Sequence, residues 1–592
     1  MIKITFLTFH IDYSIGVNVL SSILQEAGYD VSVIFFKLPA REPISWFKDN
    51  PSNMEEINPY GDIIGTNVDV NKWSVDEVNL LVNKINKLSP DLLCISSRST
   101  DKELVIDVLP QIRESCNVTT IAGGFGPTFD PKFYLDFVDY AFIGEAENAI
   151  LEIASAIEKK VPLSGIDNIC YKDNGNIVYN KLRTPDIDLF RYQKIPEETF
   201  YIEGNSIFKR NEDNQYIKKH SYSTFIGRGC ISTCSYCSAG QWRKIYKKEG
   251  INIKKRRNRK VEDIIDELIL AKRDGYTFVL FRDEFLCGNI NFLKQFFKLY
   301  EREVQLPFWA YLIPAQILDH PELLKMAVDA GFVDTEIGFQ SGSDRVNREF
   351  FTRKIPNKIS LDYARLLAEY KVNKKYDFIL FNPSETAEDI NKTFKLIQNL
   401  PKERSYLYFG RLFYFPESPV VEIIKNNQYK QSNFDYYYCI ALLYLLCFVM
   451  PKSEFEKILV NNELVNSWSK LRSIYKSYLK GHGFEFSVGT HDTPESITTH
   501  RYQRIIEKQK YDRIIVWRDE SYYKKMSHIF NNISISYIIE DNPSKKNASV
   551  FSPSILDTIE DKIPIFICSS RKWEINNRIK RFFPDYKGAV YV

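Results

Sequence analysis

The chain has 592 residues, 44% of them hydrophobic, enough for roughly three or four domains with real cores. Its formal charge of +3 at pH 7 leaves no electrostatic footprint for nucleic acid, and the basic run at residues 254–260 is interpreted as a solvated loop. Seven of the ten cysteines stand singly, which argues against a disulfide framework and indicates a reduced, cytoplasmic protein. No signal peptide is recognised, and the most apolar run, residues 436–450, is too short for a bilayer, so no membrane association is expected.

Residues 1–162 alternate between strand and helix patterns. This alternation predicts a doubly wound, Rossmann-like α/β domain whose ligands bind where the parallel strands end. The Gly123-Gly124 pair at one such end allows a large ligand to approach the backbone closely, although for a single pair the favoured interpretation is that the glycines only make the turn. The expected strands are 2–7, 31–36, 91–97, 119–122 and 140–143, and the expected helices are 17–27, 75–88, 103–114 and 147–159.

Residues 163–220 are predicted to be a connector. Residues 166–171 and 177–180 flank an Asn-Gly turn, which is the pattern of a β-hairpin. The stretch 182–198 is expected to run as a strap between domains, followed by a polar loop at 209–219.

Three cysteines, Cys230, Cys234 and Cys237, follow a strand-like run at 221–226 in the spacing C-x3-C-x2-C. Thiolates this close repel one another unless a metal neutralises them. A closed zinc site needs four protein ligands, and no fourth Cys or His lies nearby in the sequence. The favoured interpretation is an iron–sulfur cube with one open iron; zinc or three unrelated thiols are the alternatives.

Residues 221–425 repeat a strand–helix unit six times, as a partial TIM-type (β/α)6 barrel would. The carboxyl ends of such strands carry the chemistry. Asp283 and Glu284 follow the second strand, where the alternative is that they are solvated loop charges, and Gln340 and Ser341 follow the fourth. The expected strands are 221–226, 277–281, 308–312, 334–339, 377–381 and 407–415, and the expected helices are 261–273, 290–300, 322–330, 343–350, 360–369 and 387–400.

Residues 426–505 predict a helical, aromatic-rich subdomain, with helices at 436–446 and 454–471. Residues 506–592 return to α/β alternation and predict a small Rossmann-like domain. Its first turn, 518–522, has no glycine and carries two carboxylates, so this domain is degenerate as a nucleotide site and is expected to serve packing or substrate-carrier contact. Its expected strands are 513–517, 533–539, 563–568 and 589–592, and its expected helices are 521–530 and 572–583.

Several stretches resemble radical S-adenosylmethionine (SAM) enzymes. The cysteine loop, with Tyr236 directly before its last cysteine, resembles their cluster loop. Residues 338–343 (GFQSGS) resemble the family's G-x-E-S-G-S, with Gln340 in place of Glu; a neutral amide can accept from the SAM ammonium, without the charge-assisted part of that bond. Residues 377–385 (DFILFNPSE) resemble G-x-I-x-G-x-x-x-E, with Asn382 where glycine is expected.

The first domain resembles the cobalamin-binding domain that precedes the radical SAM core in one large subfamily. The resemblance lies in the G-G-x-x-P-T turn at 123–128 and the G-E-x-E turn at 144–147. The D-x-H-x-x-G loop, whose His ligates cobalt in some cobalamin proteins, is absent, and Gly126 stands where relatives often carry His. A protein ligand to cobalt is therefore not expected, and His10 is a minor candidate.

The resemblance implies three cofactors: a [4Fe–4S] cluster, SAM and cobalamin. The cluster would be held by the three cysteines and SAM would bind its open iron. The implied SAM contacts are Tyr236, Asp283, Glu284, Gln340 and Ser341, and the implied cobalamin contacts are Ser97, Gly123, Gly124, Gly144 and Glu145.

The implied activity is that of a cobalamin-dependent radical SAM methyltransferase. Such an enzyme cleaves SAM to a 5′-deoxyadenosyl radical and methylates an unactivated carbon, here of a specialised metabolite or peptide, through methylcobalamin. One alternative is a non-methylating rearrangement, oxidative cyclisation or epimerisation on the same scaffold; another is an iron–sulfur binding protein without SAM catalysis. The expected partners are a small-molecule or peptide substrate and an external electron donor such as flavodoxin or ferredoxin, with no nucleic acid and no membrane.

Overall fold

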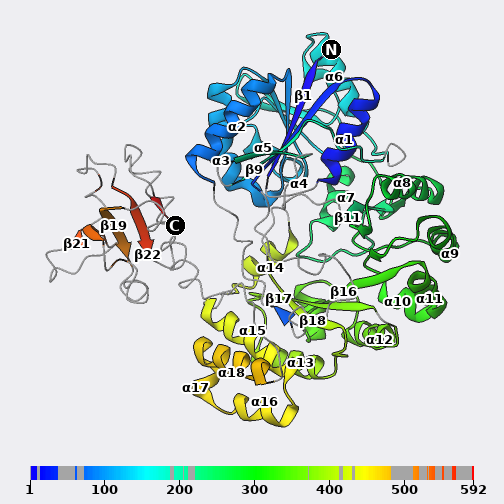
Figure 1. Cartoon of the computed structure of the whole chain (residues 1–592), viewed down its shortest axis with the longest axis vertical. Helices are drawn as coiled ribbons and strands as arrows, with labels where there is room; N and C mark the ends of the chain where they lie inside the picture. The colour runs from blue at the N-terminus through cyan, green and yellow to red at the C-terminus, as the bar shows by residue number, and fades with distance from the viewer. Residues whose placement is uncertain are drawn as a thin grey trace. The chain divides into compact units, whose positions relative to one another are not determined.

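The computed structural model divides the chain into two compact units, Met1–Phe486 and Ser487–Val592 (Figure 1). No described helix is both long and apolar enough to cross a membrane. The structure describes residues 2–9, 14–37, 61–62, 73–186, 192–203, 206–210, 221–370, 372–412, 418–429, 434–481, 511–518, 530, 533–539, 550–551, 556, 563–568 and 590–591.

The first sheet is built from parallel strands in the order β2-β1-β4-β5-β6, as the alternating pattern predicted. These strands are apolar on both faces because helices cover both: α1 and α6 pack on one core, α2 and α3 on the other. The elements are β1 (Lys3–Phe9), α1 (Ile15–Glu26), β2 (Asp30–Phe36), α2 (Val75–Leu88), β4 (Leu92–Ser96), α3 (Lys102–Ser115), β5 (Thr119–Gly123), β6 (Tyr140–Phe142) and α6 (Ala149–Glu158).

Much of the segment interpreted as a connector belongs to this sheet. The predicted hairpin forms as β7 (Ile169–Asp173) and β8 (Asn176–Tyr179), and it extends the sheet antiparallel to β6. The other edge gains β9 (Thr199–Glu203) and β10 (Ser206–Lys209), which were not predicted. The buried Lys37 ammonium holds that edge together through ion pairs with Glu77 (2.7 Å) and Glu203 (2.6 Å).

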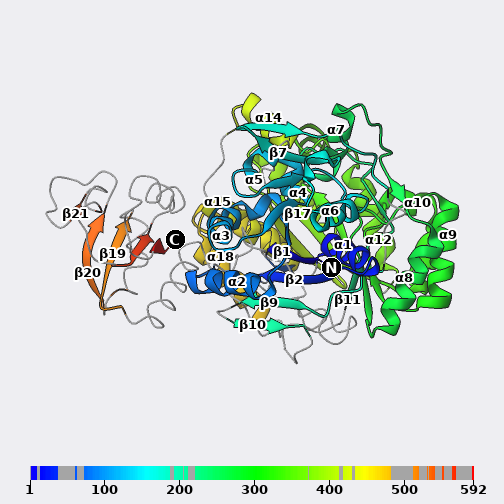
Figure 2. The ribbon, with the colours of Figure 1, turned by 90° about the horizontal axis from the view of Figure 1, so that it is seen from above.

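The second sheet follows chain order through six parallel strands, which confirms the open (β/α)6 arrangement. A short strand from the first region, β3 (Gly61–Asp62), pairs with the last of them and was not predicted. Helices α8 and α9 lie together along the outer side of the barrel in both Figure 1 and Figure 2. The elements are β11 (Ser221–Thr224), α8 (Val261–Arg273), β14 (Phe278–Phe281), α9 (Ile290–Leu299), β15 (Phe308–Trp309), α10 (Pro314–Asp319), α11 (Pro321–Ala330), β16 (Phe332–Gln340), α12 (Asn357–Ala368), β17 (Asn373–Leu380), α13 (Ala387–Gln398) and β18 (Ser405–Arg411).

A helical subdomain covers the outside of the barrel. Its first helix, α15 (Phe434–Val449), shares the barrel's buried core, and the Tyr444 ring packs against Phe378, Phe394 and Phe409. The single helix predicted at 454–471 is wrong. Asn461 ends the first segment and caps the next by accepting from the backbone of Glu463 and Leu464. The three helices are α16 (Lys452–Leu459), α17 (Asn462–Val465) and α18 (Trp468–Gly481).

The second unit contains a parallel sheet in the order β21-β20-β19-β22-β23. Numbered from its own first strand this is the order 3-2-1-4-5, which confirms the Rossmann-like expectation. The turn residues 519–522 and most of the two predicted helices lie outside the described residues. The strands are β19 (Arg513–Arg518), β20 (Ser534–Ile539), β21 (Val550–Phe551), β22 (Ile565–Cys568) and β23 (Val590–Tyr591).

Candidate functional site

The three cysteines lie on the loop between β12 (Gly227–Arg228) and α7 (Ala239–Lys248), where all three are free and half-buried. The pKa of each thiol is raised, chiefly by burial, that of Cys237 to about 11, and neighbouring thiols add to the shift at Cys230 and Cys237. Neighbouring thiols that resist ionisation become thiolates when a cationic centre neutralises them, so this donor set fits a metal cluster. In the described part of the chain, no three Cys, His, Asp or Glu side chains gather tightly enough to hold a single metal ion.

The loop is held in place from its middle by Ser235, which is buried. Its backbone N–H donates to Phe351 O (2.9 Å) and its hydroxyl donates to Phe350 O (2.6 Å). In return, Val420 N and the Ser418 hydroxyl donate to Ser235 O. The cysteine loop is therefore fastened to segments from the far side of the barrel, and its shape does not depend on a bound cluster alone.

Tyr236 packs against the apolar cluster that contains Phe350, Phe351 and Val420, with its ring edge-on to Phe351 at 5.1 Å between ring centroids. Burial raises its pKa well above the usual value, so the phenol stays neutral. Burial lowers the pKa of the nearby Arg353, which donates to Gly338 O. The aromatic residue before the last cysteine thus shields the loop from water.

Asp283 fixes the start of the cysteine loop. It is buried and accepts from Ile226 N (3.0 Å), Gly227 N (3.1 Å) and the Arg256 guanidinium. Burial raises the pKa of Asp283 to about 6. Arg256 also donates to Gly229 O (3.3 Å) and lies 3.9 Å from the partly exposed Glu284 carboxylate. Of the two predicted acids, Glu284 has the freer carboxylate, and a SAM contact for either stays a prediction.

Gln340 ends β16 with a left-handed backbone (φ 64°), beside an irregularity in the pairing with β17. Its amide forms a hydrogen bond with Asp377, while its buried Oε1 has no partner among the described residues. An orphaned buried acceptor is costly, and an ammonium donor such as that of SAM would satisfy it. Ser341 donates to Glu385 (2.6 Å), whose pKa burial raises to about 7.

In the motif at residues 377–385, the structure corrects which residue takes the place of the expected glycine. The left-handed residue after β17 is Phe381 (φ 63°), one place before Asn382. A non-glycine residue in this conformation costs of order 1–3 kcal/mol, and such strain gathers at functional sites. Asn382 instead accepts from Ser384 and leaves its buried Nδ2 without a partner in the described residues.

A group of charged residues inside the barrel was not predicted. Lys375 pairs with Glu336, which also hydrogen-bonds the buried Tyr311 hydroxyl. Burial, and to a smaller extent the neighbouring Glu336, raise the pKa of Asp377 to about 7. The sequence signal was the alternation of polar and apolar residues along β16 and β17, which places Glu336, Gln340, Lys375 and Asp377 on one face of the sheet.

The predicted set in the first domain forms two tight turns. Gly126 N donates to Ser97 O and Ser97 N donates to Gly123 O, both at 3.0 Å. A Cβ on Gly124 (φ 102°) would lie 2.7 Å from Ser97 O, so this glycine is required by the chain's own packing. A Cβ on Gly123 would meet no atom closer than Phe142 Cβ at 3.9 Å, so the packing here does not itself require a glycine.

The second turn joins the first domain to the cysteine loop. Glu145 pairs with Arg228 (2.8 Å) and Arg257, and Glu147 also pairs with Arg228. Although burial opposes ionisation, Arg228 and Arg257 hold the pKa of Glu145 below its usual value. Gly144 (φ 95°) packs so closely on Tyr246 of α7 that a Cβ would overlap the phenol oxygen. The 144–147 turn of the first domain therefore contacts the start of the cysteine loop at Arg228, two residues before Cys230.

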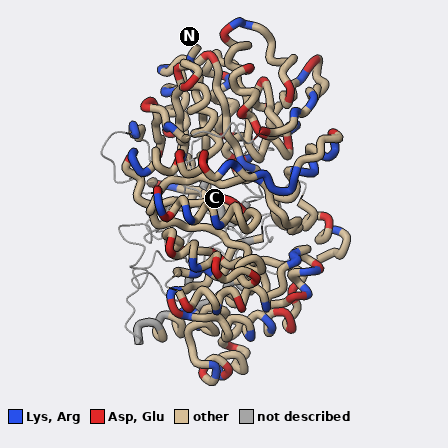
Figure 3. The backbone as a smooth tube through the Cα atoms, turned by 90° about the vertical axis from the view of Figure 1, so that its right-hand side faces the viewer, with Lys and Arg blue, Asp and Glu red and all other residues tan. Residues whose placement is uncertain are grey.

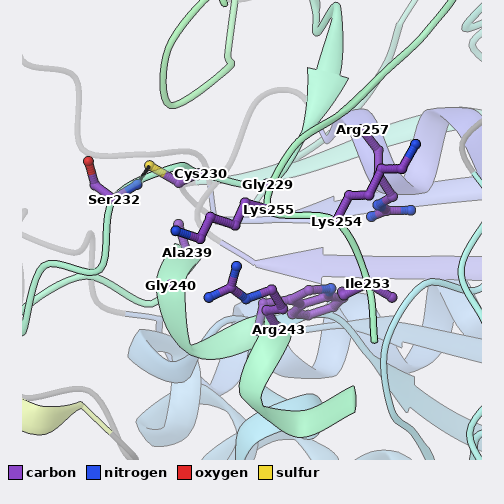
Figure 4. A pocket seen from close by; sticks show the side chains of 11 residues that line it. Gly229, Cys230, Ser232, Ala239, Gly240, Arg243, Ile253, Lys254, Lys255 and Arg257 are labelled. Carbon is purple, nitrogen blue, oxygen red and sulfur yellow. Dashed lines mark hydrogen bonds between the residues drawn. The ribbon is translucent and has the colours of Figure 1, made fainter. Parts of the chain in front are cut away.

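A small cavity opens beside the first cysteine (Figure 4). Its wall combines Cys230, the first turns of α7, and the segment 253–257. Trp242 lines it and contacts the exposed Phe125 of the first domain at 5.3 Å. A second small cavity lies between the end of β17 and α15 and includes Asn382 and Glu385. His10 lies outside the described residues.

Residues 224–397 match the model of the Radical SAM superfamily. Among curated proteins, an uncharacterized methyltransferase of Pyrococcus horikoshii is 24% identical over 331 residues, covering 53% of this chain and 66% of the relative. The anaerobic magnesium-protoporphyrin IX monomethyl ester cyclase of Rubrivivax gelatinosus is 25% identical over 359 residues, covering 57% and 59%. The matched region thus spans about two thirds or less of these relatives' lengths.

The fold of this chain is similar to that of solved structures, among them two radical SAM enzymes. The radical SAM methyltransferase TsrM of Kitasatospora setae, solved with cobalamin and a [4Fe–4S] cluster, has a TM-score of 0.53 at 15% identity, covering 72% of this chain and 78% of TsrM. The cobalamin-dependent radical SAM enzyme OxsB, solved with aqua-cobalamin and SAM, has a TM-score of 0.53 at 14% identity, covering 86% and 79%. These likenesses confirm the multi-domain α/β fold that the sequence predicted.

Proposed function

Because residues 224–397 form a radical SAM domain within the fold of cobalamin-dependent enzymes, we propose that this protein is a cobalamin-dependent radical SAM methyltransferase. Its substrate would be an unactivated carbon of a small molecule or peptide. One observation carries the proposal: buried Arg228 joins the cysteine loop directly to the Gly144–Glu147 turn of the doubly wound domain. A carrier bound at those strand ends would face the cysteines.

The residues present fit the three cofactors. The cysteines would hold the cluster, and the orphaned Gln340 Oε1 and the Glu284 carboxylate suit the SAM ammonium. The turn at Gly123, where the packing of the chain does not itself require a glycine, suits the close approach of cobalamin to the backbone. When bound, these groups supply SAM cleavage, hydrogen abstraction and a methyl carrier. The chain itself excludes water with Tyr236 and Phe351, and it fixes the loop through Ser235 and Asp283.

The test is anaerobic reconstitution with iron, sulfide and hydroxocobalamin, followed by incubation with dithionite and methyl-labelled SAM. We expect iron–sulfur and cobalamin absorption bands, 5′-deoxyadenosine, and label on cobalamin. Cys230→Ala should abolish the iron–sulfur band and 5′-deoxyadenosine, while Cys116→Ala, a buried cysteine in the first domain, should keep both. Cluster formation without any SAM cleavage would leave the iron–sulfur binding protein as the better account.

A second candidate is an oxidative cyclisation or another non-methylating reaction. It is favoured by the cyclase of Rubrivivax gelatinosus, which matches at the same level of identity as the methyltransferase relative. The same incubation separates the two candidates, because 5′-deoxyadenosine without label on cobalamin or product would contradict methyl transfer.

A further inference from the structure

The charge of the chain is concentrated on one segment. Residues 239–260, from α7 to the start of α8, contain ten Lys or Arg and one Glu, a net of +9, whereas the whole chain carries +3. The other residues together are therefore acidic. Figure 3 shows a long run of Lys and Arg crossing the middle of the molecule. Such a concentration produces a local positive field even on a nearly neutral protein.

Part of this segment is structural, which corrects its interpretation as a solvated loop. It forms β13 (Arg257–Asn258), antiparallel to β12 at the start of the cysteine loop. Arg256, Arg257 and Arg259 point their charges inward and pair with Asp283, Glu145 and Glu267. These three arginines are therefore already neutralised by the fold.

The remaining cations face outward. Six of them have no carboxylate at ion-pair distance among the described residues, and five of these six are exposed. Three of them lie on α7, before Gly250, and three lie in the segment between Gly250 and α8. We name them the basic face: Arg243, Lys244, Lys247, Lys254, Lys255 and Lys260.

The basic face adjoins the proposed cluster. Arg243, Lys254 and Lys255 line the cavity that also includes Cys230 (Figure 4). In that view the Lys255 ammonium and the Arg243 guanidinium both lie over the first turn of α7, next to the cysteine. Directly after Cys230, the Ile231 side chain is 45% exposed. An exposed apolar residue close to a concentration of positive charge is a surface suited to a transient protein partner.

We propose that the basic face is the docking surface of an acidic one-electron donor protein of the flavodoxin class. The inference rests on the proposed function, because a cluster that cleaves SAM must be reduced by one electron for each cleavage. One electron leaves the flavin hydroquinone, which becomes the semiquinone, and enters the cluster. Opposite charges would steer the donor to the side where Cys230 is nearest the surface.

The test compares two reductants on one variant. Lys244→Glu/Lys247→Glu/Lys260→Glu reverses three exposed charges of the basic face that do not line the cavity beside Cys230. The control, Lys298→Glu/Lys395→Glu/Lys457→Glu, reverses three exposed lysines on α9, α13 and α16. We expect 5′-deoxyadenosine formation driven by reduced flavodoxin to fall about tenfold or more in the first variant only. With dithionite, which needs no docking, both variants should match the unmodified protein.

Binding of oxidised flavodoxin, measured by calorimetry at low and high salt, provides a readout independent of SAM chemistry. We expect salt-sensitive binding that the basic-face variant loses and the control keeps. Equal flavodoxin-driven rates in both variants, or unchanged binding, would overturn the proposal. So would capture of an RNA oligonucleotide by this face with no flavodoxin binding. If the unmodified protein fails with dithionite, the proposed function is wrong, and the binding experiment still decides the docking surface.

Discussion

At the scale of single residues, the amide at position 340 has a partner that explains it. The motif that residues 338–343 resemble has Glu at this position. Here the neighbouring strand places Asp377 against the side chain of residue 340. An amide donates to Asp377 and keeps its oxygen free as an acceptor, whereas a second carboxylate would repel it. Gln340 and Asp377 are therefore best understood as a matched pair.

Replacing Gln340 by Glu should make SAM binding tighter as pH rises. The new carboxylate would raise the pKa of Asp377 further, from about 7, so without a bound cation the two acids ionise together only at a cost. Because the SAM ammonium stabilises the doubly ionised pair, we expect the dissociation constant for SAM to fall about tenfold between pH 6 and pH 8 in this variant, and much less in the unmodified protein. Calorimetric titration at both pH values measures it. Gln340→Glu/Asp377→Asn should remove the pH effect, and equal affinity of Gln340→Glu for SAM at both pH values would contradict the pairing.

Asp334 should make the fold less stable as pH rises. Burial raises its pKa to about 8, and Glu336 adds to this while Lys375 and Lys374 oppose it. A carboxyl whose folded pKa lies above its unfolded value contributes stability at low pH that is lost as pH rises toward the folded pKa. Asp334→Asn should therefore stabilise the protein relative to the unmodified chain at pH 8 by about 1 kcal/mol or more, and less at pH 5. Denaturant unfolding at the two pH values gives the comparison; a pH-independent difference would contradict it.

At the scale of elements, the turn at Gly144 and helix α7 are fitted to each other. Gly144→Ala combines an unfavourable backbone conformation with an overlap on the Tyr246 hydroxyl. We expect a loss of about 2 kcal/mol or more, seen as a lower melting temperature. Tyr246→Phe removes the overlapping oxygen, so the double variant should recover part of that loss. If the loss of stability in the double variant equals the sum of the losses in the two single variants, the overlap with the Tyr246 hydroxyl is not what excludes a side chain at position 144.

Elements with strong local signals could be predicted from the sequence, and those fixed by distant partners could not. Helix α8 forms over the predicted range because its apolar spacing is uninterrupted. Strand β9 is short and exists because β2 offers an edge, while α16 to α18 are separated by an Asn cap within an apparently continuous pattern. In the site, the cysteine spacing is local and was recognised. The partners of Arg228 lie more than 80 residues away, so no local pattern indicated them.

At the scale of the whole first unit, the ion pairs between the two α/β regions are largely buried. Removing one side of a buried pair leaves an uncompensated charge and typically costs about 3–5 kcal/mol. Glu145→Gln/Glu147→Gln should therefore lower the melting temperature strongly and expose the segment before Cys230 to proteolysis. Glu152→Gln breaks an exposed pair with Arg183 and should cost less than about 1 kcal/mol. Similarly small losses of stability in both variants would show that the ion pairs of Glu145 and Glu147 with Arg228 and Arg257 contribute little.

The ion pairs of Arg228 also couple ligand binding in the first domain to reduction of the centre at the cysteines. Any ligand that binds at the strand ends and displaces the 144–147 turn must move Arg228, and with it the backbone that leads into Cys230. If ligand binding changes the reduction potential of the centre at the cysteines, reduction must change the ligand's affinity by the same factor. The first domain would then act as an effector as well as a carrier, its occupancy deciding how readily an electron is accepted.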